Sequence, residues 1–205
     1  MDVIDFNNMY NNFINNNDDF TICEKILTKL RDKDPITYEH CYRVGCLSCG
    51  FSMFLGNNDK YNKQIFNSAI LHDIGKLKIS DNIMNKASKN LTFEERNELK
   101  KHPLYGAEFI LENRYEQIYY VIPVLALHHE TTDNAGCFNI DYSNISNFIL
   151  TIKICDCFDA IRVARRPDET NKSIDEALYI LSNNCFKNLK PEWIEKFNKY
   201  IKHIL

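Results

Sequence analysis

Hydrophobic residues recur at steps of three and four along most of this chain, which is the spacing of one face of an α-helix. In the stretch 38–55, for example, Val44, Leu47 and Phe51 are apolar, and Gly56 follows as a C-terminal signal. The same spacing predicts further helices along the chain. Their expected ranges are 19–34, 60–72, 92–101, 104–112, 116–130, 144–164, 174–183 and a last helix that begins at Pro191.

Helix-start signals agree with several of these ranges. Thr92 with Glu95, and Ser173 with Glu176, have the spacing of a capping box, in which each side chain pairs with the backbone N–H of the other residue. Pro103 suits the first position of a helix, where its missing N–H has no helical partner to lose. These signals place three helix starts without reference to hydrophobicity.

No run of residues alternates in the manner of a strand, and no internal repeat appears. Extended or loop-like segments are expected at 75–90 and 131–143, and Pro123 is expected to kink the helix around it. The sequence therefore predicts a single all-α domain, a compact helical bundle over residues 18–205, after an Asn-rich arm or short helix at 1–17.

The composition excludes several classes of protein. Of 205 residues, 44% are hydrophobic and 26% are charged, which provides a core and excludes a disordered chain. A net charge of −3 argues against a general binder of nucleic-acid polymers. No apolar run approaches the roughly 20 residues of a membrane span, and the first residues do not resemble a signal peptide. We therefore expect a cytoplasmic protein whose eight cysteines, Cys46-x-x-Cys49 included, are reduced and mostly packed in the core.

Five of the six histidines lie in or at the end of predicted helices, next to small or acidic residues. They are His40, His72, His102, His128 and His129. Imidazole nitrogens and carboxylates form the ligand set for divalent iron, manganese, zinc or nickel. Neighbours on a helix point about 100° apart, so His72–Asp73 and His128–His129 can each reach two metals, with an Asp carboxylate as a bridge. Asp156 and Asp159, three residues apart, share one face of another helix.

Four segments, in this order, resemble the HD-domain metal phosphohydrolases, and in detail the HD-GYP branch of that superfamily. They are HDIGKLKISDNIMNK (72–86), HPLYGAEFI (102–110), LALHHE (125–130) and CDCFDAIRVARRPDE (155–169). The resemblance covers about residues 36–185. Members of the branch are helical domains with two or three metal ions, usually iron or manganese, and they hydrolyse cyclic di-GMP or related cyclic dinucleotides. The resemblance implies the same fold, metal centre and substrate class for this chain.

The resemblance also implies a role for individual residues. The implied metal ligands are His40, His72, Asp73, His102, His128, His129 and Asp156, with Asp73 as the bridging carboxylate. Lys76 matches a lysine that faces the scissile phosphate, and Asp159 matches a second acid, which we expect to pair with Lys76. Arg166 matches an arginine that contacts phosphate. Asp73, Lys76 and Asp159 are thus the candidates for roles in catalysis.

The chain departs from the branch at three places, one of which is Asp168 and Glu169, where aromatic and basic residues normally follow Arg-Arg-Pro. The signature after the paired histidines normally ends in Gly-Tyr-Pro, whereas this chain keeps Gly136 and has Cys137 and Phe138 in the next two positions. A ring that stacks on the substrate would therefore have to come from Phe138. Ile36 stands four residues before His40, where members with three metals have a glutamate ligand, and this favours a centre of two divalent ions.

The sequence therefore predicts a metal-dependent phosphodiesterase that hydrolyses a cyclic dinucleotide through a hydroxide bridging two metals. Two alternatives stay open. One is an HD-type phosphohydrolase of a mononucleotide or another phosphate ester, which the altered Gly-Tyr-Pro segment favours. The other is a metal-retaining binding module of low activity, which the complete ligand set disfavours. The expected partner is a small nucleotide and neither a nucleic-acid polymer nor a membrane, and nothing in the sequence indicates an oligomeric state.

Overall fold

The computed structural model describes residues 19–131, 140, 145–165, 169–184 and 189–205. Every element in these ranges is a helix, and no strand occurs among them. The α-helices are α2 (Phe20–Lys33), α3 (Pro35–Phe54), α4 (Asp59–Leu71), α5 (Asp81–Met84), α6 (Phe93–Leu99), α7 (His102–Glu112), α8 (Ile122–Leu127), α9 (Asn147–Arg162), α10 (Ile174–Asn184) and α11 (Pro191–Ile204). The 3-10 helices are η1 (Ile74–Lys78), η2 (Ser88–Asn90) and η3 (Glu116–Val121). The predicted all-α fold is confirmed.

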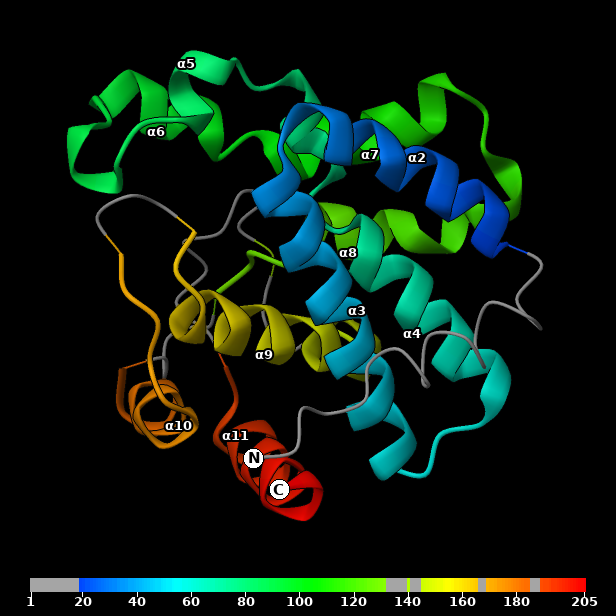
Figure 1. Ribbon diagram of the computed structural model, residues 1–205. Helices are drawn as coiled ribbons and strands as arrows, with labels where there is room; N and C mark the ends of the chain where they lie inside the picture. Colours follow the sequence, from blue (N-terminus) through cyan, green and yellow to red (C-terminus); the bar gives the residue numbers. More distant parts are fainter. Residues whose placement is uncertain (1–18, 132–139, 141–144, 166–168, 185–188) are drawn as a thin grey trace.

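Helix α3 runs through the middle of the molecule, along α4 and across α9 (Figure 1). Asp34 begins this helix, because its carboxylate accepts the backbone N–H of Thr37 and Pro35 follows in the first turn. The close packing of α3 on α4 depends on Gly45, since a Cβ there would lie 2.4 Å from Cγ2 of Ile70. Helices α3, α4 and α9 contact one another, and α2, α8, α10 and α11 pack against them.

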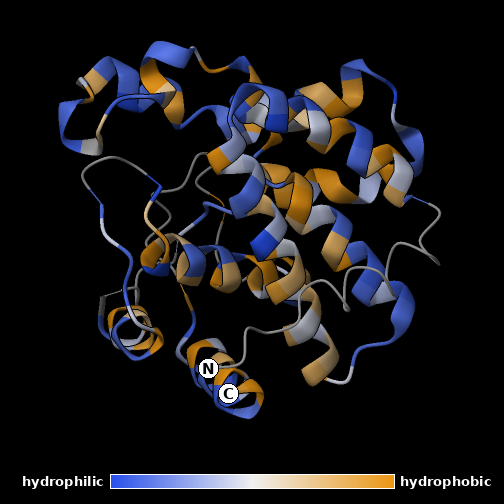
Figure 2. Ribbon diagram, in the orientation of Figure 1, coloured by the Kyte–Doolittle hydropathy of each residue, from blue (hydrophilic) through white to orange (hydrophobic). Residues whose placement is uncertain are grey.

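Two large apolar clusters fill most of the described interior, and a small third one is formed by Ile79, Ile83 and Leu91. In the cluster between α3, α9 and α11, the ring of Phe51 packs edge-on against Trp193 and Phe197, with centroids 5.9 Å and 5.3 Å away. Trp193 thus anchors the last helix to the core. The second cluster lies among α2, α3, α4, α7 and α8. Helices α2, α10 and α11 have both hydrophobic and hydrophilic residues along their length (Figure 2), as elements do that bury one face.

The cysteines behave as core residues. Cys46 and Cys49 are each 1% exposed and belong to the second apolar cluster, which confirms that this pair packs in the core. Burial raises the pKa of the Cys46 thiol to about 12, and this disfavours the thiolate that metal binding or redox chemistry would need. All six cysteines within the described ranges are free.

Two segments differ from the sequence prediction. The range 75–90, predicted as an extended loop, contains most of η1 together with α5 and η2. These helices are only 3 to 5 residues long, so they are too short to display a helical repeat of apolar residues. Pro123 does not kink a longer helix, because η3 ends at Val121 and Pro123 lies in the first turn of a new helix, α8.

Both predicted capping boxes are confirmed. Thr92 and Glu95 cap each other at the start of α6, and Ser173 and Glu176 do so at the start of α10. The predicted arm at 1–17 and most of the predicted loop at 131–143 lie outside the described residues. No helix in the described ranges is both long and apolar enough to cross a membrane.

Candidate metal centre

The histidines and aspartates singled out in the sequence come together at one place in the fold. They are His40 from α3, His72 and Asp73 from the end of α4 and the start of η1, His102 from α7, His128 and His129 directly after α8, and Asp156 from α9. All except His129 are buried. Residues more than 110 positions apart in the sequence, such as His40 and Asp156, therefore meet in the interior.

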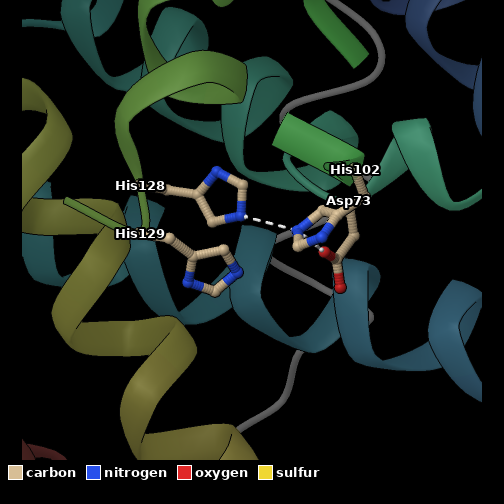
Figure 3. Close-up of side chains that lie close together, drawn as sticks. All are labelled: Asp73, His102, His128 and His129. Carbon is tan, nitrogen blue, oxygen red and sulfur yellow. Dashed lines mark hydrogen bonds and ion pairs between the residues drawn. The ribbon is translucent and has the colours of Figure 1, made fainter. Parts of the chain in front are cut away.

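The potential ligand atoms form two groups that share Asp73. One group is Asp73, His102, His128 and His129, and the other is His40, His72 and Asp73. Within each group, one ligand atom from every residue lies within 4.8 Å of the others. Figure 3 shows the first group, with the rings of His128 and His129 side by side and His102 and Asp73 opposite them. Among the described residues Asp73 alone belongs to both groups, which is the position a bridging ligand needs.

The carboxylate of Asp73 faces both groups. Its Oδ1 atom lies 3.1 Å from Nε2 of His102. Its Oδ2 atom lies 3.5 Å from Nε2 of His72 and 3.8 Å from Nε2 of His40. Asp156 adds a second carboxylate beside the latter two rings, with Oδ1 at 3.0 Å from Nε2 of His40 and 3.6 Å from Nε2 of His72. Each group thus combines imidazole nitrogens with carboxylate oxygens.

Hydrogen bonds at Nδ1 determine which nitrogen of each buried ring faces the centre. His72 donates to the main-chain oxygen of Ala69 and His102 to that of Leu99, both at 2.7 Å. His128 donates to two main-chain oxygens of α8, both at 3.0 Å. Because Nδ1 has the hydrogen, Nε2 of each neutral ring has the lone pair that a metal ion requires.

The Nε2 atom of a neutral ring accepts a hydrogen bond, and the atoms that face it here are other Nε2 atoms and carboxylate oxygens, which also accept. Nε2 of His102 and Nε2 of His128 are 3.3 Å apart, the contact dashed in Figure 3, although each ring already donates from Nδ1. Two lone pairs at that distance repel unless a proton or cation lies between them. The Nε2 atoms of His40 and His72 are buried and make no hydrogen bond in the described part of the chain. A cation would satisfy all four atoms, so these residues fit a metal centre.

The two carboxylates are ionised despite their burial. Burial by itself would raise the pKa of Asp73, but Lys76, His72 and His102 hold this pKa well below its usual value. Burial also opposes the charge of Asp156, but the neighbouring rings of His40 and His72 lower the pKa of this carboxyl well below its usual range. Both groups are therefore available as anionic ligands at neutral pH.

Asp159 corrects one prediction. The sequence predicts that it pairs with Lys76, whereas its Oδ2 atom accepts Nδ1–H of His40 at 2.7 Å. Arg43 donates to both carboxylate oxygens of Asp159, at 2.8 Å and 3.0 Å. Lys76 pairs instead with Oδ2 of Asp73, at 2.5 Å. The prediction is wrong because Asp159 lies where α9 packs on α3, whereas Lys76 lies in η1. Asp159 orients the ring of His40 and does not reach Lys76.

Two cations beside the centre were missed from the sequence. Arg43 binds Asp159 with two hydrogen bonds, and its position one turn from a predicted ligand on the same helix was the available signal. Lys153 is 3% exposed and donates to the main-chain oxygens of His128, at 2.9 Å, and Glu130, at 2.5 Å. Its signal was a single charge inside an otherwise apolar run.

Helices η1 and α7 approach so closely that position 75 must be glycine. A Cβ at Gly75 would lie 1.9 Å from the main-chain oxygen of His102 and 2.5 Å from the nitrogen of Gly106. Lys33 of α2 donates to the main-chain oxygens of Leu77 and Ile79, at 2.8 Å and 2.6 Å. These contacts hold Asp73, which immediately precedes η1, beside His102.

Some predicted residues cannot be placed in this geometry. Phe138 and Arg166 lie outside the described residues, as do Gly136 and Cys137. Their predicted contacts with the substrate stay predictions. Ile36, at the position of a third-metal ligand in the resembling family, is 53% exposed and offers no ligand atom.

Comparisons with known proteins identify the family of this chain. Residues 37–161 match the family model described as "HD domain". A cyclic di-GMP phosphodiesterase from Thermotoga maritima is 31% identical over 180 residues, which cover 87% of this chain and 48% of the relative. The "3'3'-cGAMP-specific phosphodiesterase 3" of Vibrio cholerae is 29% identical over 168 residues, which cover 82% of this chain and 36% of the relative.

A solved structure gives the same result for the fold. An HDG"Y"P protein from Bdellovibrio bacteriovorus superimposes with a TM-score of 0.65 at 22% identity, covering 83% of this chain and 53% of that chain. The matches to the two curated relatives span about half or less of the length of each relative.

Proposed function

This chain belongs to the HD-domain family, and we propose that it is a metal-dependent phosphodiesterase that hydrolyses a cyclic dinucleotide. The observation that supports the proposal most strongly is the set of Nε2 atoms directed at the Asp73 carboxylate. Their rings are already fixed at Nδ1 by acceptors, so Nε2 is the atom that each ring presents to a metal ion. Ligands for two cations on either side of one carboxylate suit the hydrolysis of a phosphodiester.

The proposed ligands divide between two ions. They are His102, His128 and His129 for one ion, His40, His72 and Asp156 for the other, and Asp73 for both. Divalent iron or manganese bound there would supply Lewis acidity, which activates water for attack on phosphorus and neutralises charge on the phosphate. Asp159, which Arg43 holds with two hydrogen bonds, keeps Nε2 of His40 directed at the centre.

Lys76 is the proposed contact to the scissile phosphate. Its side chain is 14% exposed and its ammonium lies 2.5 Å from Oδ2 of Asp73, so it adds a positive charge at the edge of the centre. Arg166, whose fork-shaped guanidinium suits a phosphate, and Phe138, whose ring suits a base, are proposed as further contacts on the basis of the family resemblance.

The proposed substrate class follows from the relatives. One curated relative is named for cyclic di-GMP and the other for 3′3′-cGAMP, so we extend the class to this chain and leave the bases open. A second candidate function, hydrolysis of a mononucleotide or another phosphate ester, is favoured by a specific feature. Cys137 and Phe138 stand where the family signature has Tyr and Pro, and this changes the part of the site expected to face a base.

Metal analysis of protein purified without oxygen, combined with a hydrolysis screen, tests the proposal. We expect about two divalent ions per chain, cleavage of cyclic di-GMP or 3′3′-cGAMP to a linear dinucleotide, loss of cleavage on chelation, and recovery when manganese or iron is restored. Turnover of mononucleotides alone would support the second candidate function. Bound metal without turnover of any phosphate ester would contradict both and identify a binding module.

Phe138→Ala tests the proposed contact with a base. We expect the affinity for a cyclic dinucleotide to fall by about one to two orders of magnitude, because stacking of one base contributes about 1–3 kcal/mol. Hydrolysis of a small chromogenic phosphodiester should change little. Phe93→Ala is the matched control, since Phe93 is 74% exposed on α6. Equal losses on both substrates would mean that Phe138 packs in the core.

A further inference from the structure

Lys153 is a buried charge that the metal centre described above does not use. It lies in the middle of α9, where nine of the ten residues from Ile149 to Phe158 are buried. Its own side chain is 3% exposed. Burying an ammonium costs several kcal/mol unless hydrogen bonds replace water. A leucine or methionine would fill the same space without that cost, so the contacts of the ammonium group require an explanation.

Those contacts are to the backbone that follows α8. Nζ of Lys153 donates to the main-chain oxygen of His128 at 2.9 Å and to that of Glu130 at 2.5 Å. Both carbonyls lie beyond α8, which ends at Leu127, so neither has a partner within that helix. Glu130 is fully buried, so water does not replace such a partner there. Lys153 therefore stabilises the backbone from His128 to Glu130 in one conformation.

This backbone segment contains half of one proposed ligand group. His128 and His129 belong to the group of Asp73 and His102, whereas Asp156 belongs with the other group. Asp156 lies three residues, about one turn, beyond Lys153 on the same helix. Lys153 thus connects the paired histidines to the helix that presents the carboxylate of the second group.

We propose that Lys153 is a positioning residue that fixes His128 and His129 for metal binding. The proposal rests on the proposed metal centre. Lys153 acts through the backbone, because two of its donors bind main-chain oxygens and its side chain is nearly inaccessible. Its loss should therefore affect the ion of the paired histidines and leave the ion of His40 and His72 in place.

Calorimetric titration with Mn²⁺ tests this on Lys153→Met, which keeps the length of the side chain and removes its charge. We expect one of two binding events to weaken by about 10- to 100-fold, the usual effect of losing a group that orients a ligand, while the other is unchanged. His129→Ala should weaken the same event, and His72→Ala the other. Lys153→Met combined with His129→Ala should lose little more than His129→Ala alone. Lys199→Met, an exposed lysine on α11, is the control and should bind as the unmodified protein does.

Lys153→Arg, which retains the charge and the donors, should recover most of the affinity. Where the methionine variant does not fold, Lys153→Gln replaces it with the same expectation. Equal weakening of both binding events, or a lower melting temperature with both events intact, would overturn the positioning role. Absence of Mn²⁺ binding to the unmodified protein would instead overturn the proposed metal centre itself, so the two failures are distinguishable.

Discussion

Individual atoms determine what this centre can bind. Nδ1 of His40, His72, His102 and His128 donates to an acceptor outside the centre, and Nε2 of each ring is left for a proton or a metal ion. The carboxylate of Asp73 lies between the two groups of rings, because Oδ1 faces His102 and Oδ2 faces His72.

Asp73→Ala should remove both ions, whereas His72→Ala and His129→Ala should each weaken one. The reason is that Asp73 alone among the described residues belongs to both ligand groups. Elemental analysis after equilibration with Mn²⁺ measures the occupancy, and circular dichroism verifies that the helices remain. Full metal occupancy in Asp73→Ala would show that this carboxylate is not a bridge.

Metal binding should release protons and become stronger as the pH rises. Burial opposes a positive charge on His72, but the carboxylate of Asp73 raises the pKa of this ring well above its usual value of 6.5. Without metal, His72 is therefore protonated at neutral pH, and a metal ion must displace that proton. A lower pH favours the proton, and a higher pH favours the metal.

Calorimetric titrations with Mn²⁺ in buffers of different ionisation enthalpy count the released protons. The unmodified protein should release more protons per chain than His72→Ala at about pH 7. An affinity that does not change with pH, or equal proton release from both proteins, would be inconsistent with this competition.

At the scale of elements, the centre depends on how closely short helices approach long ones. Asp73 lies between the end of α4 and η1, and η1 packs against the first turns of α7 through a contact that has no room for a side chain at Gly75. On the neighbouring helix, Gly106 has more room, because the nearest atoms to a Cβ there are 3.4 Å away. The two glycines therefore make a matched pair.

Gly75→Ala should destabilise the protein by more than about 3 kcal/mol, the upper end of what overpacking usually costs, because the new Cβ would overlap the backbone of His102. Gly106→Ala should be neutral or stabilising, since alanine favours a helix by about 1 kcal/mol over glycine. Denaturant unfolding measures both changes, and Mn²⁺ titration of the folded fraction should show weaker binding only in Gly75→Ala. Comparable stability of the two variants would contradict the close approach of η1 to α7.

At the scale of the whole molecule, the sequence predicted what repeats or is chemically distinctive, and it missed what depends on packing. Long amphipathic helices and capping boxes were predictable because their signals are local, as at Thr92 and Glu95. Candidate ligands were identifiable because histidines and aspartates are conspicuous in apolar helices. The partner of Asp159 and the contacts of Lys153 were not predictable, because they depend on which helices lie side by side. The short helices between 74 and 90 lack a repeat altogether.

X-ray anomalous scattering from crystals of the protein loaded with Mn²⁺ would locate the bound ions directly. We expect two peaks, one on each side of the Asp73 carboxylate, with ligand atoms at about 2.0–2.2 Å, by analogy with other divalent ions bound by nitrogen and oxygen. One peak should be bound by His102, His128 and His129, and the other by His40, His72 and Asp156. Peaks elsewhere, or none beside Asp73 in Mn²⁺-saturated crystals, would contradict a two-metal centre bridged by Asp73.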